Sequence, residues 1–455
     1  MGFVDSILYN LPEVQPPTQK KLAFSEKLKW TILMLALFFI LGLVPLYGLG
    51  ANALQQFEFL SVILGASFGS IISLGIGPIV TASIVLQLLN GSGIVKFDLT
   101  SHDGKRRYQG IQKLLSLFFV LFEGAIYVMM GGLAPAPGIS PAILIFQLFL
   151  GGILVMFMDE VVSKYGFGSG ISLFIAAGVS QSLFIRAFNP LPSPTQPGVA
   201  SGAIPALVQS LSLGDAVNAG LMLAAIVATT VVFLLAVYGQ SMKVEIPLSF
   251  GRVRGYGVRW PLHFFYTSNI PVILVAALIA NVQLFGKLLY DWGHPVLGTF
   301  SGNQPISGLA AWLYGPQIIR SWITGSLTMA DIFQSLVYVG FMIGGAVLFS
   351  IFWVQTSGLD ARSQANQMLN SGLQIPGFRK DPRVLERMLG RYIWPLTVLG
   401  GIAVGILAAL ADISGALTSG TGLLLTVSIV YKLYEEIAQQ HLMDMNPMMR
   451  KFITG

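Results

Sequence analysis

The sequence contains no cysteine and few charged residues, and both absences restrict what the chain does. Without cysteine, disulfide bonds and thiolate metal sites are excluded. No ligand spacing relates the four histidines, which are His102, His263, His294 and His441. Neither the phosphate-binding motif G-x-x-x-x-G-K-[ST] nor the zinc-protease motif H-E-x-x-H occurs. The chain therefore lacks a residue set for nucleotide hydrolysis or zinc proteolysis, and we expect no enzyme activity, metal or cofactor.

The scarcity of charge indicates an integral membrane protein. Charged residues make up only 10% of the 455 residues, whereas a soluble domain has about 25%. Hydrophobic residues make up 54%, and the mean hydropathy is +0.73. The net charge of +6 is compatible with nucleic acid or anionic surfaces as partners, so the positions of the basic residues matter more than their sum.

Hydrophobicity along the chain predicts about ten membrane-spanning helices and an all-α fold. The predicted spans are 28–49, 57–74 leading into 76–89, 110–133, 140–158, 168–188, 214–240, 266–290, 330–355, 392–411 and 418–434. With both chain ends in the cytoplasm, all Lys and Arg residues except Arg186, Lys287 and Arg320 lie on the cytoplasmic side. This distribution follows the positive-inside rule.

The spans divide into two equal sets, separated by a segment rich in Pro, Ser and Gly. Each set has five spans. Because five is an odd number, the second half enters the membrane from the opposite side, and an inverted repeat is allowed. The predicted parts are an N-terminal half (1–188), an external hinge loop (189–213), a C-terminal half with two basic cytoplasmic loops (214–438) and a cytoplasmic tail (439–455).

The first residues predict a short helix in the membrane interface, because Phe3, Ile7 and Leu11 recur at helical spacing. A cleavable signal peptide is the alternative. The apolar run after Lys29, however, lacks a short core followed by a small-residue cleavage site. We therefore expect the first span to be retained.

The chain is organised around an apolar run, residues 70–89, that is broken by Gly75, Gly77 and Pro78. After Pro78 only about 11 apolar residues remain, roughly 16 Å of helix, whereas the hydrocarbon core is about 30 Å thick. Broken backbone survives at this depth only where protein buries it or where it lines a wet cavity. The break therefore indicates a pathway through the molecule. An ordinary proline kink is the alternative.

Three stretches resemble the SecY/Sec61α family of protein-translocating channels. The first is GIGP at 75–78, followed by TA at 81–82 and Gln87. The second is DEVVSKYGFGSGISLFI at 159–175. The third, FYTSNIPVIL at 265–274, is similar to the archaeal and eukaryotic branch of the family. Together they extend over nearly the whole chain.

The resemblance implies two inverted halves around a central pore that passes unfolded polypeptide and releases membrane segments sideways into lipid. The family's aliphatic constriction corresponds to Ile76, Val80, Ile171, Ile175, Ile273 and Leu425. Periodicity does not show this ring, but in each of the pairs Ile76–Val80 and Ile171–Ile175 a spacing of four is compatible with one helix face. The family's plug corresponds to the segment from Phe57 through Gly65 to Phe68, for which half of a normal span is the alternative.

Among the acidic residues, Glu123 lies nearest the middle of a predicted span, and an intramembrane carboxylate indicates a functional site. A protonated acid bonded to a neighbouring helix is the alternative. By the resemblance, Glu123 joins Thr81 and Asn281 at a lateral gate. Asp215 and Asp331 are predicted to begin helices, where the positive end of the helix dipole favours a carboxylate.

Two long cytoplasmic loops, 241–263 and 356–392, carry basic residues suited to a polyanion such as structured RNA. Positive-inside topology alone is the alternative explanation. By the resemblance, these loops bind the ribosome through Arg252, Arg254 and Arg379. The other implied partners are signal peptides, nascent polypeptides, lipid and two small membrane subunits of the SecE/Sec61γ and Secβ/Sec61β types. The implied location is an archaeal plasma membrane, or the endoplasmic reticulum in a eukaryote.

Two other classes of protein remain open at this point. A secondary transporter also uses broken helices and inverted halves. Ion coupling, however, needs several carboxylates within the membrane, and Glu123 alone is weak evidence for it. A structural scaffold would not need the Gly-Pro break. Passage of a secretory polypeptide into vesicles separates a channel from both.

The predicted topology is testable with single cysteines, because the chain has none of its own. Cysteines at Gly104 and Gly372 should react with an impermeant maleimide from the cytoplasm, and one at Ser193 should react from outside. Reaction of the Ser193 and Gly372 variants from the same side would show that the two-half arrangement is wrong.

Overall fold

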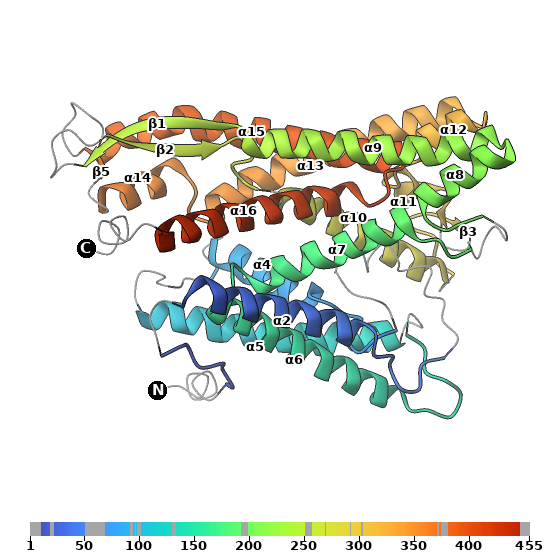
Figure 1. The fold of residues 1–455 in the computed structure, drawn as a ribbon, viewed down its shortest axis with the longest axis horizontal. Helices are drawn as coiled ribbons and strands as arrows, with labels where there is room; N and C mark the ends of the chain where they lie inside the picture. The colour runs from blue at the N-terminus through green and yellow to red at the C-terminus, as the bar shows by residue number, and fades with distance from the viewer. Residues whose placement is uncertain are drawn as a thin grey trace. The chain divides into compact units, whose positions relative to one another are not determined.

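The computed structural model (Figure 1) divides into two compact units, which we describe separately. The first unit comprises residues 1–181 and 429–455, and the second comprises residues 182–428. The predicted division at residues 188 and 213 stays a prediction. The structure describes residues 11–18, 22–50, 69–91, 94–95, 97, 102–129, 133–192, 199–250, 257–268, 270–291, 293–301, 304–370, 373–374 and 381–445.

In the part of the chain that the structure describes, ten long helices correspond in order to the ten predicted spans. They are α2 (Phe24–Gly42), α4 (Gly77–Gly91), α5 (His102–Met129), α6 (Pro141–Tyr165), α7 (Gly170–Phe188), α9 (Ala216–Ser241), α10 (Ile270–Asp291), α13 (Met329–Thr356), α15 (Pro382–Ser414) and α16 (Gly420–Met445). The shorter helices are α8 (Ala203–Leu213), α11 (Gly308–Trp312), α12 (Ile318–Ile323) and α14 (Ala361–Asn370). The strands are β1 (Lys243–Phe250), β2 (Gly257–His263), β3 (Phe300–Ser301), β4 (Gln304–Pro305) and β5 (Leu373–Gln374).

Within the described residues, seven helices are long and apolar enough to cross a membrane. The remaining three long helices differ for identifiable reasons. α2 carries Glu26, Lys27 and Lys29 near its start, and α16 carries charged residues in its second half. α4 has only 15 residues, because the chain before it is not helical.

Two predicted helix starts are confirmed. Asp215 is the N-cap of α9, and its side chain accepts a hydrogen bond of 3.1 Å from the backbone N–H of Asn218. Hydrogen bonds from Asn218 lower the pKa of Asp215. Asp331 lies in the first turn of α13 and forms a capping box with Thr328. Both carboxylates satisfy N–H groups that have no partner within their helix.

The first unit packs α2, α5, α6 and α7 around two apolar clusters. One cluster includes Phe38, Val155 and Phe174, with the Phe38 and Phe174 rings stacked at 4.7 Å. The other includes Val120 and Leu148, together with Leu46, Leu74, Val128, Leu133 and Leu144. The absence of a side chain at Gly152 of α6 leaves room for Val120 of α5, which an added Cβ would meet at 2.4 Å.

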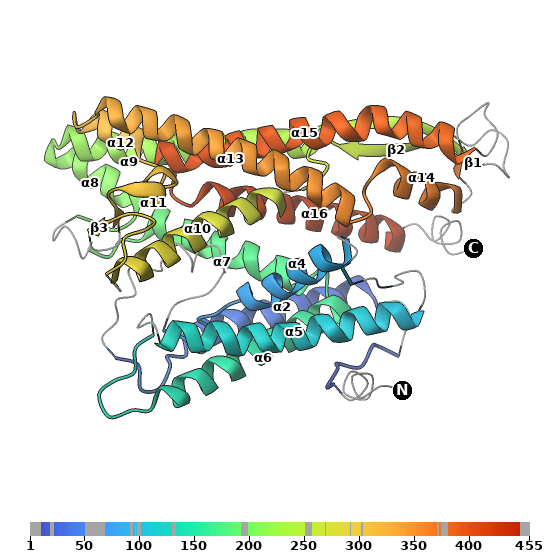
Figure 2. The same cartoon turned by 180° about the vertical axis from the view of Figure 1, so that it is seen from behind.

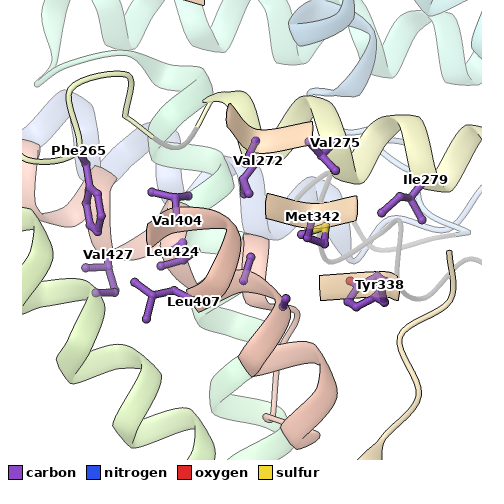
Figure 3. Close-up of a cluster of buried hydrophobic side chains, with 14 of the residues drawn as sticks. Phe265, Val272, Val275, Ile279, Tyr338, Met342, Val404, Leu407, Leu424 and Val427 are labelled. Carbon is purple, nitrogen blue, oxygen red and sulfur yellow. The ribbon is translucent and has the colours of Figure 1, made fainter. Parts of the chain in front are cut away.

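The second unit packs α10, α13, α15 and α16 around one large cluster, drawn in Figure 3. Its labelled members are Phe265, Val272, Val275, Ile279, Tyr338, Met342, Val404, Leu407, Leu424 and Val427. Gly401 and Gly405, four residues apart on α15, lie against the α13 backbone; an added Cβ would be 3.2 Å from Val347 Cα or 3.0 Å from Ile343 Cα. Such small-residue pairs allow close packing of membrane helices. Figure 2 shows α10 and α13 from behind.

A small sheet of order β2-β1-β5 belongs to the second unit and joins the two basic loops. β1 and β2 pair antiparallel, and β5 pairs with the last two residues of β1. Ile246, Leu262 and Trp260 pack with α14 and the first turns of α15. The Tyr266 hydroxyl donates a 2.7 Å hydrogen bond to the Leu359 carbonyl, and burial raises the pKa of Tyr266 to about 12. The two loops are therefore one packed structure.

The segment before α2 is bound by α5 and by the C-terminal end of α6. The Lys113 ammonium ion donates to the Pro12 carbonyl and forms an ion pair with Glu160, whose carboxylate accepts from the Val14 N–H at 2.9 Å. Glu13 pairs with Lys164 at 2.5 Å. The hydrogen bond and charge of Lys164 lower the pKa of Glu13. The predicted interfacial helix before this segment lies outside the described residues.

The segment between α7 and α9 differs from its prediction. The segment 189–213 was expected to be a loop because of its Pro, Ser and Gly content, but residues 203–213 form α8. Ile204, Val208 and Leu211 recur at helical spacing in this segment, and Gly214 ends the helix in a left-handed conformation (φ 71°). Pro205 is tolerated because it falls in the first turn.

Candidate functional site

The predicted break before α4 is confirmed. Residues 71–76 form turns, and regular helix begins only at Gly77. Gly75 has a positive φ of 56°, a conformation that favours glycine. Its N–H donates to the Ile72 carbonyl at 2.8 Å, whereas the Val80 N–H donates to the Ile76 carbonyl at 3.0 Å in the first helical turn. At 15 residues and about 22 Å, α4 is shorter than the hydrocarbon core.

The broken backbone is held by protein on two sides. The Leu46 N–H donates to the Gly69 carbonyl at 2.8 Å, and the Ile71 N–H donates to the Val44 carbonyl at 2.9 Å. On the other side the Ile71 carbonyl lies against Gly151 of α6, where an added Cβ would be 1.8 Å from its oxygen. Protein therefore buries this backbone, as required at membrane depth.

Four of the six predicted pore residues lie in one apolar cluster of the first unit. Ile76 is 1% exposed and belongs to the core of the cluster. Val80, Ile171 and Ile175 are half-buried and pack against the same core. Within each of the two pairs, both residues pack on the same cluster, which is compatible with their spacing of four. The break and the start of α7 thus bring aliphatic side chains together, three of which keep exposed surface.

The start of α7 is positioned by Asp159 of α6. Its carboxylate accepts a 2.8 Å hydrogen bond from the N–H of Ile171, one of the predicted pore residues. Gly170 permits this approach, because an added Cβ would be 2.6 Å from the Cα of Asp159. The neighbouring Glu160 instead binds Lys113 and the N-terminal segment. The two adjacent acids of this stretch therefore have different roles.

The turn between α6 and α7 rests on the start of α2. The Phe167 N–H donates to the Thr31 hydroxyl at 3.1 Å, and the Phe167 ring lies 5.3 Å from the Phe24 ring. The Lys27 ammonium ion lies 5.7 Å from the centre of the Phe167 ring. These contacts hold the turn in place, and the hydrogen bond between Asp159 and Ile171 holds the start of α7 next to it. Sequence analysis missed Thr31 and Gly151; the adjacent pair of glycines at 151 and 152, inside an apolar helix, was the available signal for close packing.

Thr81 and Glu123, two of the three predicted gate residues, are brought together. Thr81 follows the break by one turn on α4, and its hydroxyl is hydrogen-bonded to the Glu123 carboxyl on α5. Asn281 lies on α10 in the second unit, and its side chain is outside the described residues. The alternative interpretation of Glu123, an acid bonded to a neighbouring helix, agrees with this contact.

The remaining predicted residues belong to the second unit or lie outside the described residues. Ile273 on α10 and Leu425 on α16 follow Val272 and Leu424, which belong to the large cluster, but neither is itself a member. They therefore differ in packing from their neighbours. The plug residues Phe57, Gly65 and Phe68 lie outside the described residues, as do the basic residues Arg252, Arg254 and Arg379.

The fold and the interrupted helix define a multi-pass α-helical membrane protein with buried broken backbone. A sequence model of SecY matches residues 70–434, and one described as "Plug domain of Sec61p" matches residues 37–69. The chain belongs to the SecY family. A relative from Methanothermobacter thermautotrophicus, "Protein translocase subunit SecY", is 49% identical over 447 residues, which cover 97% of this chain and 96% of the relative.

Solved structures agree with this assignment. "The structure of a protein conducting channel" is 43% identical, with a TM-score of 0.81 over 96% of this chain and 97% of that chain. "Sec61 in the Canine ribosome-channel complex from the endoplasmic reticulum" is 42% identical, with a TM-score of 0.79 and the same coverages. The predicted fold class and the predicted family are confirmed.

The contact between Gly151 and the break generates a testable prediction. Gly151→Ala places a methyl group against a backbone oxygen that cannot rotate away, so the break must shift. Overpacking of this kind costs about 1 to 3 kcal/mol. We expect thermal unfolding in detergent at a lower temperature than for the parent.

The matched control is Gly344→Ala on α13, where an added Cβ meets no heavy atom within 4 Å. Higher helix propensity makes this variant as stable as the parent or more stable by up to about 1 kcal/mol. If both variants unfold at the same temperature, the contact does not support the break.

Proposed function

We propose that this chain forms the pore of a protein-translocating channel and that the aliphatic cluster at the break is part of its constriction. The chain's membership of the SecY family makes it a subunit of a protein translocation channel. The observation that carries the residue assignment is the packing of Ile76, Val80, Ile171 and Ile175 on one cluster in the first unit. Ile273 and Leu425 would complete the ring from the second unit.

The chemistry of these side chains suits a channel that must let polypeptide through but must not let ions leak across the membrane. Aliphatic groups offer no hydrogen bonds to water, so a narrow ring of them excludes water and closes by dewetting. The same ring makes no polar contacts with a passing chain and is therefore indifferent to its sequence. The start of α7, which carries both Ile171 and Ile175, is held for this role by the hydrogen bond that the Ile171 N–H donates to the Asp159 carboxylate.

The Thr81–Glu123 contact supports a lateral gate on α4 and α5, with Asn281 as the proposed third member. In a membrane, an interhelical hydrogen bond contributes about 0.6 kcal/mol on average. A gate made of a few such contacts opens and closes with small changes in free energy, which suits recognition of variable apolar signal sequences. We propose the segment 57–68 as the plug.

Ribosomal RNA is the proposed partner of the basic loops. β5 pairs with Ser249 and Phe250, the last residues before the segment that holds Arg252 and Arg254. Arg379 follows five residues after Gln374, the end of β5. One sheet therefore adjoins both basic segments along the chain, an arrangement suited to simultaneous contacts with phosphates. We also propose small membrane subunits of the SecE/Sec61γ and Secβ/Sec61β types as partners.

The constriction is tested by making it polar. The triple variant Ile76→Asn, Ile171→Ser, Ile175→Ser should wet the ring, so we expect raised resting ion conductance per folded channel in planar bilayers. Deletion of 57–68 in the same variant should raise it further. A secondary transporter would instead show ion movement coupled to a small solute and no passage of a secretory polypeptide.

The matched control changes the buried core of the same cluster. Ile72→Ser with Leu173→Ser removes side chains that are 2% and 7% exposed. This variant should lose stability, about 1 kcal/mol or more per site, without leaking. The assignment of the ring is ruled out if the triple variant has the same ion conductance per folded channel as the parent. It is also ruled out if the control variant conducts as much as the triple variant.

A further inference from the structure

Helix α8 carries its large apolar side chains on its outward face. Ile204, Val208 and Leu211 are 36%, 65% and 66% exposed and recur at i, i+4 and i+7. The buried face consists of the small residues Ala203, Ala206 and Ser210. A surface helix in water has the opposite distribution, with its apolar stripe toward the core. The outward face of α8 is therefore suited to an apolar environment.

The position of α8 in the second unit supports the same conclusion. Gly214 and Asp215 alone separate α8 from α9, and the two helices pack together. In both views α8 folds back beside the Asp215 end of α9 (Figures 1 and 2). The first turns of α9 expose Val217 and Leu223, at 48% and 52%, as expected for a span that faces lipid. The two exposed apolar surfaces lie on adjoining helices.

The sequence around α8 offers no charged side chain to an ionic partner. The sequence has no charged residue between Arg186 and Asp215. With 11 residues, α8 is about 16 Å long, which is roughly half the thickness of the hydrocarbon core. On α12, which packs against α9, Trp322 is 71% exposed, and exposed tryptophan is typical of the membrane interface.

We propose that α8 is immersed in the lipid leaflet at the Asp215 end of α9, with Ile204, Val208 and Leu211 in contact with acyl chains. α8 and α9 then form a helical hairpin that enters half of the bilayer before the chain crosses it. The segment that connects α7 with α9 is anchored in lipid rather than exposed to water. This inference is independent of the proposed pore residues.

Nitroxide labels on single cysteines test the proposal in the assembled complex in phosphatidylcholine nanodiscs. The test positions are Ile204, Val208 and Leu211, all on the exposed face, so the packing of α8 on α9 is unchanged. Leu223 on α9 is the lipid control, and Gln304, exposed on β4, is the water control. Power-saturation EPR measures collisions with oxygen, which partitions into lipid, and with a water-soluble nickel chelate.

We expect the three α8 labels to resemble Leu223, with an oxygen-to-nickel collision ratio several-fold higher than at Gln304. Ratios equal to that at Gln304 would place α8 in water and overturn the proposal. Protection of the Val208 and Leu211 labels from both reagents would also overturn it, because another protein chain would then cover the face. Retained polypeptide translocation by each labelled variant establishes that the complex is intact.

Discussion

The structure depends on one constraint: peptide groups that leave a helix within the membrane must find partners in the protein. The chain before α4 meets it by pairing with Val44 and Leu46 on one side and by pressing the Ile71 carbonyl against Gly151 on the other. This packing allows a half-length helix to start inside the unit with Ile76 buried in its cluster. A further contact aligns α7 with the same cluster: the Asp159 carboxylate accepts a hydrogen bond from the Ile171 N–H. The candidate constriction is thus assembled by contacts that are mostly backbone.

Much of this architecture was predictable from the sequence because membrane spans and helix interruptions have strong local signals. The ten long helices lie at the predicted spans, and Gly75, Gly77 and Pro78 mark the break correctly. The spacing of four in Ile171 and Ile175 predicted their shared packing, since helix geometry alone determines it. The membership of Ile76, Val80, Ile171 and Ile175 in one constriction came from family resemblance, because no local pattern relates residues about 95 positions apart.

Other features could not be predicted, or were overlooked, for physical reasons. The contact of Thr31 with Phe167 joins distant segments and has no local pattern. The adjacent glycines at 151 and 152 indicate close packing, but they do not identify Ile71 as the partner. The alternation of Val244, Ile246 and Leu248 is a strand signal. The strand signal is short and lies within a loop whose most prominent feature is its basic charge. The helix α8 was assigned to a loop because composition outweighed a short apolar repeat, and its outward apolar face needed the structure to be recognised.

The central claim, that polypeptide passes the aliphatic residues at the break, is tested most directly by photocrosslinking. A photoreactive residue is placed singly at Val80, Ile171 or Ile175, which are half-buried, and at Leu173, which lies on another face of α7 and is 7% exposed. A secretory polypeptide is then arrested during its passage through the reconstituted complex. Our account predicts crosslinks from the three ring positions and none from Leu173. Equal crosslinking at Leu173, or no crosslinks at the ring positions while the polypeptide is arrested, would contradict it.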